Sequence, residues 1–448
     1  MSNTTLVLLG ALVAFVLSGI AARILGPEKF GLATYILSMS GLLSVVCSFG
    51  YQFKFSKIQR QHIIDRKEFH KASSLSLIAL ILLIPILLIY SFINHSSQLI
   101  IFISIIHAAA YILVEQIYYY YNSTGLSLKA AFHKSIIPKF LPLALVSMFY
   151  FYNVNMTAEQ YLYFLILGLI TVCLANIHLF KLTLPTFKYI NDIKNIYTVQ
   201  LLYFCPSLLL RILYVEIASL TALAYLAIGL MFTQVINLLG MSICNQLAPN
   251  LRTSIRQSDS KKISSILNDT AFYPTILMLP IIVALFYNFE LLINILGDQY
   301  QTNTASLIIY SILAGAIFNI LTGATGTILM LSSFVKLELY TGITKAVMVW
   351  AIFFVVQFYS PILSVPIALT SGELIANLIK AIQVKKYFNT WPWSKEKLLI
   401  AFGALIIMIA ASEIISSIAY TESLSFILSI IATTLIMCSA LILNRRMI

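Results

Sequence analysis

Residues 6–53 read LVLLGALVAFVLSGIAARI-LGPEKF-GLATYILSMSGLLSVVCSFGYQF, and this stretch decides the class of fold. Two apolar runs, 6–24 and 31–53, flank the short connection 25–30. A helix of about 20 apolar residues crosses the hydrocarbon core of a bilayer, so the stretch predicts two membrane-spanning helices joined by a tight turn. Six Lys and Arg residues follow in 54–71. Because such residues collect in cytoplasmic loops, the N-terminus is expected in the cytoplasm, two crossings earlier.

The composition of the whole chain agrees with a membrane protein. Hydrophobic residues make up 60% and charged residues 10% of the 448 residues, and the mean hydropathy is +0.94. This much apolar surface cannot be hidden in a water-soluble core, so part of it must face lipid. The net charge of +12 is dispersed over the breaks between apolar runs, which excludes nucleic acid as the expected partner.

The same alternation continues along the chain and predicts 14 membrane-spanning helices. Of the 28 Lys and Arg residues, 25 fall on alternate breaks, and the breaks between them carry almost none. An even number of crossings places both termini in the cytoplasm. The expected spans are 6–24, 31–53, 73–93, 98–121, 136–153, 159–180, 198–217, 221–246, 271–293, 304–330, 339–359, 366–384, 398–418 and 423–443.

An internal repeat predicts how these helices are grouped. Sliding the chain by 190 positions places Tyr35 on Tyr225 and Gly50 on Gly240. The offset superimposes the second helix on the eighth, so two six-helix halves would share one orientation in the membrane. We therefore expect an all-α protein with bundles at 1–197 and 198–390 around a central cleft, followed by two helices in 391–448. Such a cleft is a common basis for alternating access.

Several other patterns narrow the expected function. The N-terminal segment has no basic leader and is interpreted as a retained helix rather than a signal peptide. All five cysteines lie in expected spans without paired spacing, so neither a disulfide nor a zinc site is indicated. No phosphate-binding glycine loop appears, which argues against an ATP-driven pump. His107, two helical turns before Glu115, could relay protons or hydrogen-bond a neighbouring helix.

Five ionisable residues within or at the ends of the expected spans are the candidate site residues. An ionised side chain at the centre of a membrane helix costs roughly 2.5–3.5 kcal/mol on insertion scales, so it usually faces a cavity or a partner. For Arg23 and Glu216 the alternative is a side chain that reaches the headgroups. For Glu115 the alternative is a neutral, buried carboxyl. Arg211 keeps its charge and is expected to face a polar cavity, as is Glu373.

Three segments resemble a known family. The segment ARILGPEKFG at 22–31 is similar to the turn after the first helix in polysaccharide flippases of the Wzx type, within the multidrug/oligosaccharidyl-lipid/polysaccharide exporter superfamily. Ala224-Tyr225 together with QLAP at 246–249 resembles the two ends of that family's eighth helix, and LINILGDQY at 292–300 resembles its turn between helices 9 and 10. No acidic residue lies in the first helix, unlike some ion-coupled drug exporters.

The resemblance implies a flippase and not an enzyme. It implies movement of an undecaprenyl-diphosphate-linked oligosaccharide, such as an O-antigen repeat unit, to the outer leaflet of the bacterial cytoplasmic membrane. Arg23 and Arg211 would bind the diphosphate. Glu115, Glu216 and Glu373 would be ion-coupling candidates, with H+ or Na+ as the coupling ion and no other cofactor or metal. Membrane lipids, a polysaccharide polymerase and a chain-length regulator are the further expected partners.

Two alternatives remain open. A drug or cation exporter of the same superfamily would share the fold. Such an exporter usually binds a cationic substrate in an acidic cavity, whereas the candidate cavity residues here include Arg23 and Arg211. A membrane glycan polymerase would have similar length and hydropathy, but such enzymes need a sizeable outer loop with catalytic side chains. The expected outer breaks are short and nearly uncharged.

Overall fold

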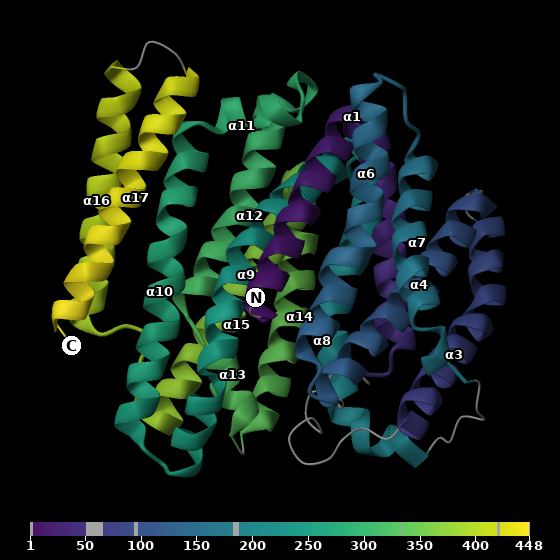
Figure 1. Cartoon of the computed structure of the whole chain (residues 1–448), viewed down its shortest axis with the longest axis horizontal. Coiled ribbons are helices and arrows are strands. Elements are labelled where there is room, and N and C mark those ends of the chain that lie inside the picture. The colour runs from purple at the N-terminus through teal and green to yellow at the C-terminus, as the bar shows by residue number, and fades with distance from the viewer. Residues whose placement is uncertain are drawn as a thin grey trace. The chain divides into compact units, whose positions relative to one another are not determined.

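The computed structural model describes residues 3–50, 66–93, 97–181, 188–332, 334–418 and 422–447. Its described residues are helical with short turns and contain no strand (Figure 1). Thirteen of the helices are long and apolar enough to cross a membrane. The chain is therefore an all-helical, multi-pass membrane protein, as predicted.

The first helical element, α1 (Asn3–Cys47), contains the first expected span and the second, 31–53, as far as Cys47. Its 45 residues would extend about 67 Å as a straight helix, whereas the hydrocarbon core is about 30 Å thick. Gly26 interrupts it with φ 72° and ψ 171°, a left-handed conformation that is costly for residues with a Cβ. Pro27 follows and suits the first turn of the second arm. The count of 13 elements thus agrees with about 14 crossings.

Contacts between Cα atoms group the chain into two compact units. The first contains Met1–Met231 and Gln357–Val365, and the second contains Phe232–Val356 and Pro366–Ile448. The predicted boundary after residue 197 falls inside the helix at 188–217, whereas the contacts place this whole helix in the first unit. The division into two six-helix bundles and two additional helices remains a prediction.

In the first unit, α1 packs against five other long helices. The buried Tyr214 hydroxyl donates to the carbonyl of Ile362, which ties the segment Gln357–Val365 to this unit. The elements of this unit after α1 are α3 (Arg66–Ile93), α4 (Gln98–Ser123), α5 (Ser127–Ala131), the π-helical turn η1 (Phe132–Ile136), α6 (Ile137–Phe151), α7 (Ala158–Ala175), η2 (Ile177–Leu179) and α8 (Lys188–Ile217), and α9 (Leu220–Arg256) begins in it. The five long helices that contact α1 are α3, α4, α6, α7 and α8.

The second unit contains the rest of α9 and the C-terminal helices. These are α10 (Ser260–Tyr287), α11 (Phe289–Leu296), η3 (Asp298–Tyr300), α12 (Asn303–Leu321), α13 (Thr325–Leu331), α14 (Val335–Tyr359), α15 (Pro361–Phe388), α16 (Lys395–Ile418) and α17 (Glu422–Met447). The last two helices lie side by side and pack against α10 (Figure 1). Phe272 and Met408 are fully buried in that contact.

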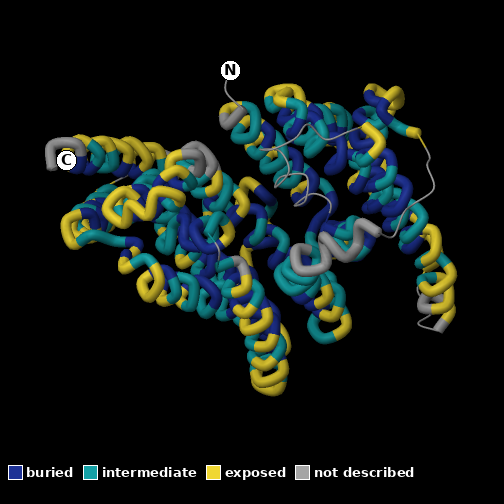
Figure 2. Tube along the Cα trace, turned by 90° about the horizontal axis from the view of Figure 1, so that it is seen from below, coloured by how far each residue is buried: buried dark blue, intermediate teal, exposed yellow. Residues whose placement is uncertain are grey.

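The surface of the last helices is apolar. Large hydrophobic side chains are exposed along α16, including Leu399, Phe402 and Ile418. Exposed positions also recur along the helix that ends at the C-terminus (Figure 2). A helix with apolar residues on its exposed side is stable in lipid but not in water, so these faces agree with a membrane environment.

Three expected spans differ from the observed helices. The span predicted at 271–293 is divided at Asn288, where α10 ends and α11 begins. The span predicted at 304–330 is divided by the turn 322–324. The helix predicted at 136–153 begins earlier, at Ser127, and includes a π-helical turn. Hydropathy could not place these boundaries because the breaks at Asn288 and 322–324 are too short to interrupt an apolar run, and the polar π-helical segment resembles the end of a loop.

Candidate functional site

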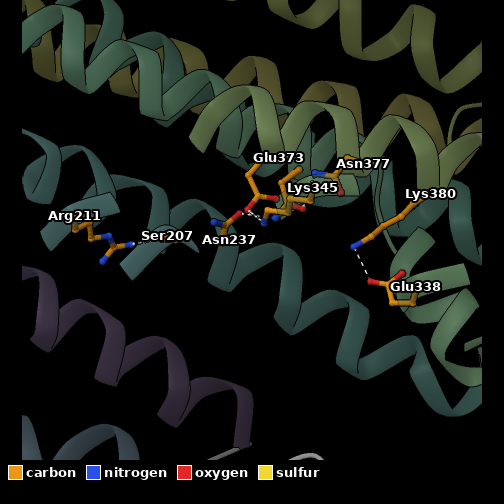
Figure 3. Close-up of polar contacts among 9 residues, drawn as sticks. Ser207, Arg211, Asn237, Glu338, Lys345, Glu373, Asn377 and Lys380 are labelled. Atoms are coloured by element: carbon orange, nitrogen blue, oxygen red, sulfur yellow. Dashed lines mark hydrogen bonds and ion pairs between the residues drawn. The ribbon is translucent and has the colours of Figure 1, made fainter. Parts of the chain in front are cut away.

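Arg211 is a cation inside a membrane-spanning helix. It is the fifteenth of the 21 residues of the span Tyr197–Ile217. Its Nη2 donates to Ser207 Oγ at 3.2 Å, one helical turn earlier (Figure 3). Its Nε is buried and has no hydrogen-bond partner among the described residues. No ion pair formed by described residues includes Arg211, so α8 holds a permanent positive charge that none of them neutralises.

Arg211 and Glu216 lie on the same helix but form no ion pair with each other. Glu216 is exposed. Residues five apart are about 140° apart around a helix, which explains the separation. Arg23 is exposed on α1, and its guanidinium carbon lies 5.8 Å from the ring centroid of Tyr150 on α6. That distance is within the range of a cation–π contact.

Glu115 is a buried carboxylate with a lysine partner. It is 8% exposed on α4, and both of its carboxylate oxygens lie 2.8 Å from Lys134 Nζ. Lys134 belongs to the π-helical turn η1, and its Nζ lies 4.4 Å from the ring centroid of Tyr118. Lys134 precedes the span predicted at 136–153, but in the structure it belongs to a helical segment that already begins at Ser127.

His107 makes a contact between helices. Its Nδ1 lies 2.6 Å from Ser40 Oγ, which joins α4 to α1. The imidazole also stacks on the ring of Tyr111 with 6.3 Å between centroids, and the Tyr111 side chain hydrogen-bonds to Glu115. The expected helix-to-helix hydrogen bond is therefore present, and a tyrosine lies between the two residues considered for a proton relay.

Two ion pairs join α14 to α15 in the second unit. Glu373 pairs with Lys345, and Glu338 Oε1 lies 2.9 Å from Lys380 Nζ (Figure 3). The Glu373 side chain is 42% exposed, whereas those of Lys345, Glu338 and Lys380 are 11%, 6% and 12% exposed. Glu373 was predicted to face a cavity or a partner, and its partner is a lysine.

The acidic residues Glu338 and Asp269 also form ion pairs, although neither was among the predicted site residues. Asp269 Oδ1 on α10 lies 2.5 Å from Lys397 Nζ on α16. A signal for the α14–α15 pairs does exist in the sequence. Glu338 precedes Lys345 by the same interval that separates Glu373 from Lys380, in the same acid-to-base order. When two antiparallel helices both have this pattern, the carboxylate of each helix lies opposite the lysine of the other. Two ion pairs then form, about two helical turns apart along the helix axes.

A polar cavity of about 220 Å³ lies inside the second unit. Three asparagines from different helices line it and are linked in a chain. Asn319 Nδ2 donates to Asn237 Oδ1 at 2.9 Å, and Asn377 Nδ2 donates to Asn319 Oδ1 at 3.2 Å. The threonines 270, 325 and 327 and Lys380 complete its polar lining. The cavity could hold several water molecules or one small polar group.

A second cavity of the same unit is apolar. It has a volume of about 430 Å³ and is lined by side chains of α10, α12, α15, α16 and the connection before α16, including Leu279, Phe318, Trp391 and Phe402. Trp393 also contributes, and its Nε1 donates to the carbonyl of Leu321 at 2.7 Å. The arrangement suits a hydrocarbon chain and has almost no group that would bind a charged ligand.

Comparison with solved structures identifies the fold. The lipid II flippase MurJ in an inward closed conformation matches with a TM-score of 0.66 and 15% sequence identity over 97% of this chain and 98% of that chain. An inward-facing multidrug resistance MATE family transporter of the MOP superfamily matches with a TM-score of 0.54 and 14% identity over 85% of this chain and 94% of that chain. A MATE transporter in complex with MaD3S gives a TM-score of 0.53 and 12% identity, with coverages of 86% and 96%.

No protein-family model and no curated protein matches the sequence. At these identities the structural likeness shows the fold, which is the one found in the MurJ flippase and in MATE transporters. The expected superfamily fold is thus confirmed. The narrower resemblance to Wzx-type flippases stays a prediction.

Proposed function

We propose that this protein is a flippase that moves an undecaprenyl-diphosphate-linked oligosaccharide across a bacterial cytoplasmic membrane. The observation that carries the proposal is Arg211, a permanent cation inside a span with no carboxylate partner among the described residues. Such a residue is costly unless it serves an anionic ligand or faces water. A diphosphate supplies the complementary charge through charge-assisted hydrogen bonds.

The rest of the structure supports a lipid-linked substrate. The fold is shared with a lipid II flippase. Arg23 would provide a second contact for the diphosphate. Within the second unit, the apolar cavity beside α16 has the lining that a hydrocarbon chain such as a polyprenyl tail requires. Outward movement of a negative charge is favoured by roughly 2.3 kcal/mol per 100 mV when the inside is negative.

Ion coupling with H+ or Na+ is part of the proposal. Glu115 and Glu373 each form an ion pair with a lysine, so a coupling ion would have to compete with the lysine ammonium group for the carboxylate. Glu216 is exposed and would need no such exchange. We further propose that both termini are cytoplasmic, and that the product passes to a polysaccharide polymerase and its chain-length regulator.

A MATE-like exporter of drugs or cations is the second candidate, because MATE transporters share the fold. The cation Arg211 on α8, which no described carboxylate neutralises, favours an anionic substrate instead. The exporter predicts that loss of the gene leaves surface glycan unchanged and lowers resistance to cationic compounds.

The deciding experiment uses a strain that lacks the gene. Lipid-linked oligosaccharide is labelled, and the membrane face that presents it is determined with an impermeant glycan-modifying reagent. Complete single units confined to the cytoplasmic face support the flippase. Single units on the outer face would indicate a polymerase, and normal glycan would favour the exporter. The same strain complemented with the wild-type gene is the control.

A further inference from the structure

Lys139 is a second cation inside the first unit, and it lies farther from the start of its helix than the predicted span 136–153 implied. It is the thirteenth of the 25 residues of the span Ser127–Phe151. Each end of the span is therefore about 18 Å away along the helix axis. Lys139 therefore lies within the body of a candidate membrane-spanning helix, where an ionised side chain is costly unless it has a partner or a ligand.

The partner of Lys139 does not neutralise it. Lys139 Nζ donates to the carbonyl oxygen of Gly10 on α1 at 3.0 Å. No described acidic side chain forms an ion pair with it. Both Lys134 and Glu115 lie within electrostatic range of Lys139, but Glu115 is engaged by Lys134 through both carboxylate oxygens. Two ammonium groups thus share one carboxylate, and the cluster has one excess positive charge.

The local backbone places Lys139 in this position. An ideal Cβ on Gly10 would lie 2.4 Å from Ser135 Cβ and 2.5 Å from its carbonyl oxygen, so α1 approaches η1 at a distance that only glycine permits. The π-helical turn accommodates one extra residue. Lys134 and Lys139 are five positions apart, and the extra residue brings them closer to one face than in a regular helix.

We propose that Lys139 is a binding residue for a phosphate oxygen of the diphosphate headgroup. A lysine ammonium has three donors, and Gly10 accepts from one of them, which leaves two for an oxyanion. Arg23 stacks on Tyr150 farther along the same two helices, α1 and α6. The headgroup would therefore meet a cation at the middle of this helix pair and another nearer its end. The inference rests on the proposed function and adds a residue to it.

The test measures binding by the full-length protein in nanodiscs of phosphatidylcholine, which carry no net lipid charge. The probes are farnesyl diphosphate, inorganic pyrophosphate and farnesol, titrated by calorimetry. Lys139→Met removes the charge and suits hydrocarbon, so the helix is expected to insert. Lys139→Arg keeps the charge. Lys261→Gln removes an exposed positive charge at the start of α10 and is the matched control.

Loss of a hydrogen bond between charged groups predicts that Lys139→Met weakens farnesyl diphosphate binding about tenfold or more. We expect Lys139→Arg and Lys261→Gln to stay close to wild type, and farnesol affinity to be the same in all variants. An equal loss for pyrophosphate would assign the site to diphosphate from any source. A loss for farnesyl diphosphate alone would assign it to the lipid headgroup.

Two negative results have different meanings. If the wild type binds farnesyl diphosphate and Lys139→Met binds it equally well, the inference is overturned and the proposed function stands. If the wild type binds neither diphosphate, the proposed substrate class fails and the role of Lys139 fails with it. Should Lys139→Met not yield a folded protein, Lys139→Gln removes the charge but keeps a polar side chain, and wild-type binding of farnesyl diphosphate by that variant would overturn the inference.

Discussion

At the scale of single residues, the charges in the spans divide into two groups. Glu115, Glu373, Glu338 and Asp269 each pair with a lysine. Arg211 and Lys139 have no described carboxylate partner and donate only to a hydroxyl and a carbonyl. Paired charges are explained by the stability of the helix bundle. Cations without a counter-charge have a cost that folding does not recover, so they are the residues to connect with an anionic substrate.

The first residue-level prediction concerns Arg211. We expect Arg211→Ala to reduce transport of lipid-linked oligosaccharide by about 100-fold or more, since a charged hydrogen bond contributes roughly 1.5–3 kcal/mol and the diphosphate offers more than one acceptor. Arg211→Lys should retain part of the activity because it keeps the charge but not the planar fork. Transport is measured as outer-face glycan in the complemented deletion strain, with membrane insertion checked by immunoblot. Full activity of Arg211→Ala would remove this residue from the mechanism.

A second prediction concerns the Glu115–Lys134 pair. Lys134→Met leaves a carboxylate that is 8% exposed without its ammonium partner. Breaking a buried pair in this way costs about 3–5 kcal/mol, so the thermal midpoint in detergent should fall by several degrees. The double variant Glu115→Gln with Lys134→Met should recover most of the loss. Equal midpoints for the single and double variants would show that the pair does not stabilise the unit.

At the scale of elements, the ion pairs of α14 and α15 fix the register of two antiparallel helices. Glu338 pairs with Lys380 and Glu373 with Lys345, two helical turns apart on each helix. A shift of one helix along the other by one turn would separate all four groups inside the membrane. The sequence contained this information as two equal acid-to-base intervals, but both lysines lie near the ends of expected spans and were counted with the neighbouring cytoplasmic breaks. Hydropathy predicts the membrane-spanning helices and their order along the chain, but it does not predict which helices pack against each other.

A charge exchange tests this register. Lys380→Glu alone brings two carboxylates together, and we expect it to lower the thermal midpoint clearly. Glu338→Lys combined with Lys380→Glu restores opposite charges at the same level, so the coupling between the two changes should be about 1–3 kcal/mol. A double-mutant cycle of thermal denaturation in detergent measures it. Lys261→Glu, at an exposed position, is the matched control. Additive effects of Glu338→Lys and Lys380→Glu would contradict the ion pair between these two residues.

At the scale of the whole molecule, the sequence predicted the class of fold because lipid imposes one requirement on every span. In hydrocarbon, the N–H and C=O groups of the backbone must form hydrogen bonds within a helix. Each apolar run of sufficient length in the sequence therefore indicates one membrane-spanning helix. Arg211 was also predicted, because arginine at that depth is conspicuous. Lys139 was missed since an apolar run with a lysine at its edge looks like a loop boundary. Only the π-helical turn and the approach of Gly10 place that lysine inside the bundle.

The topology of the whole chain supplies the last prediction. The turn between α6 and α7 includes the exposed Asn155, and the turn between α9 and α10 includes the exposed Ser258. Three helices, α7, α8 and α9, lie between them, so an odd number of crossings places the two turns on opposite sides. Positive-inside counting assigns Asn155 to the outside, because Lys and Arg flank Ser258. In a cysteine-free background, an impermeant maleimide should label Asn155→Cys in intact cells and Ser258→Cys only after permeabilisation. Labelling of both sites in intact cells would contradict the odd number of crossings. Labelling of Ser258→Cys alone in intact cells would invert the predicted orientation of every helix and the transport direction proposed from it.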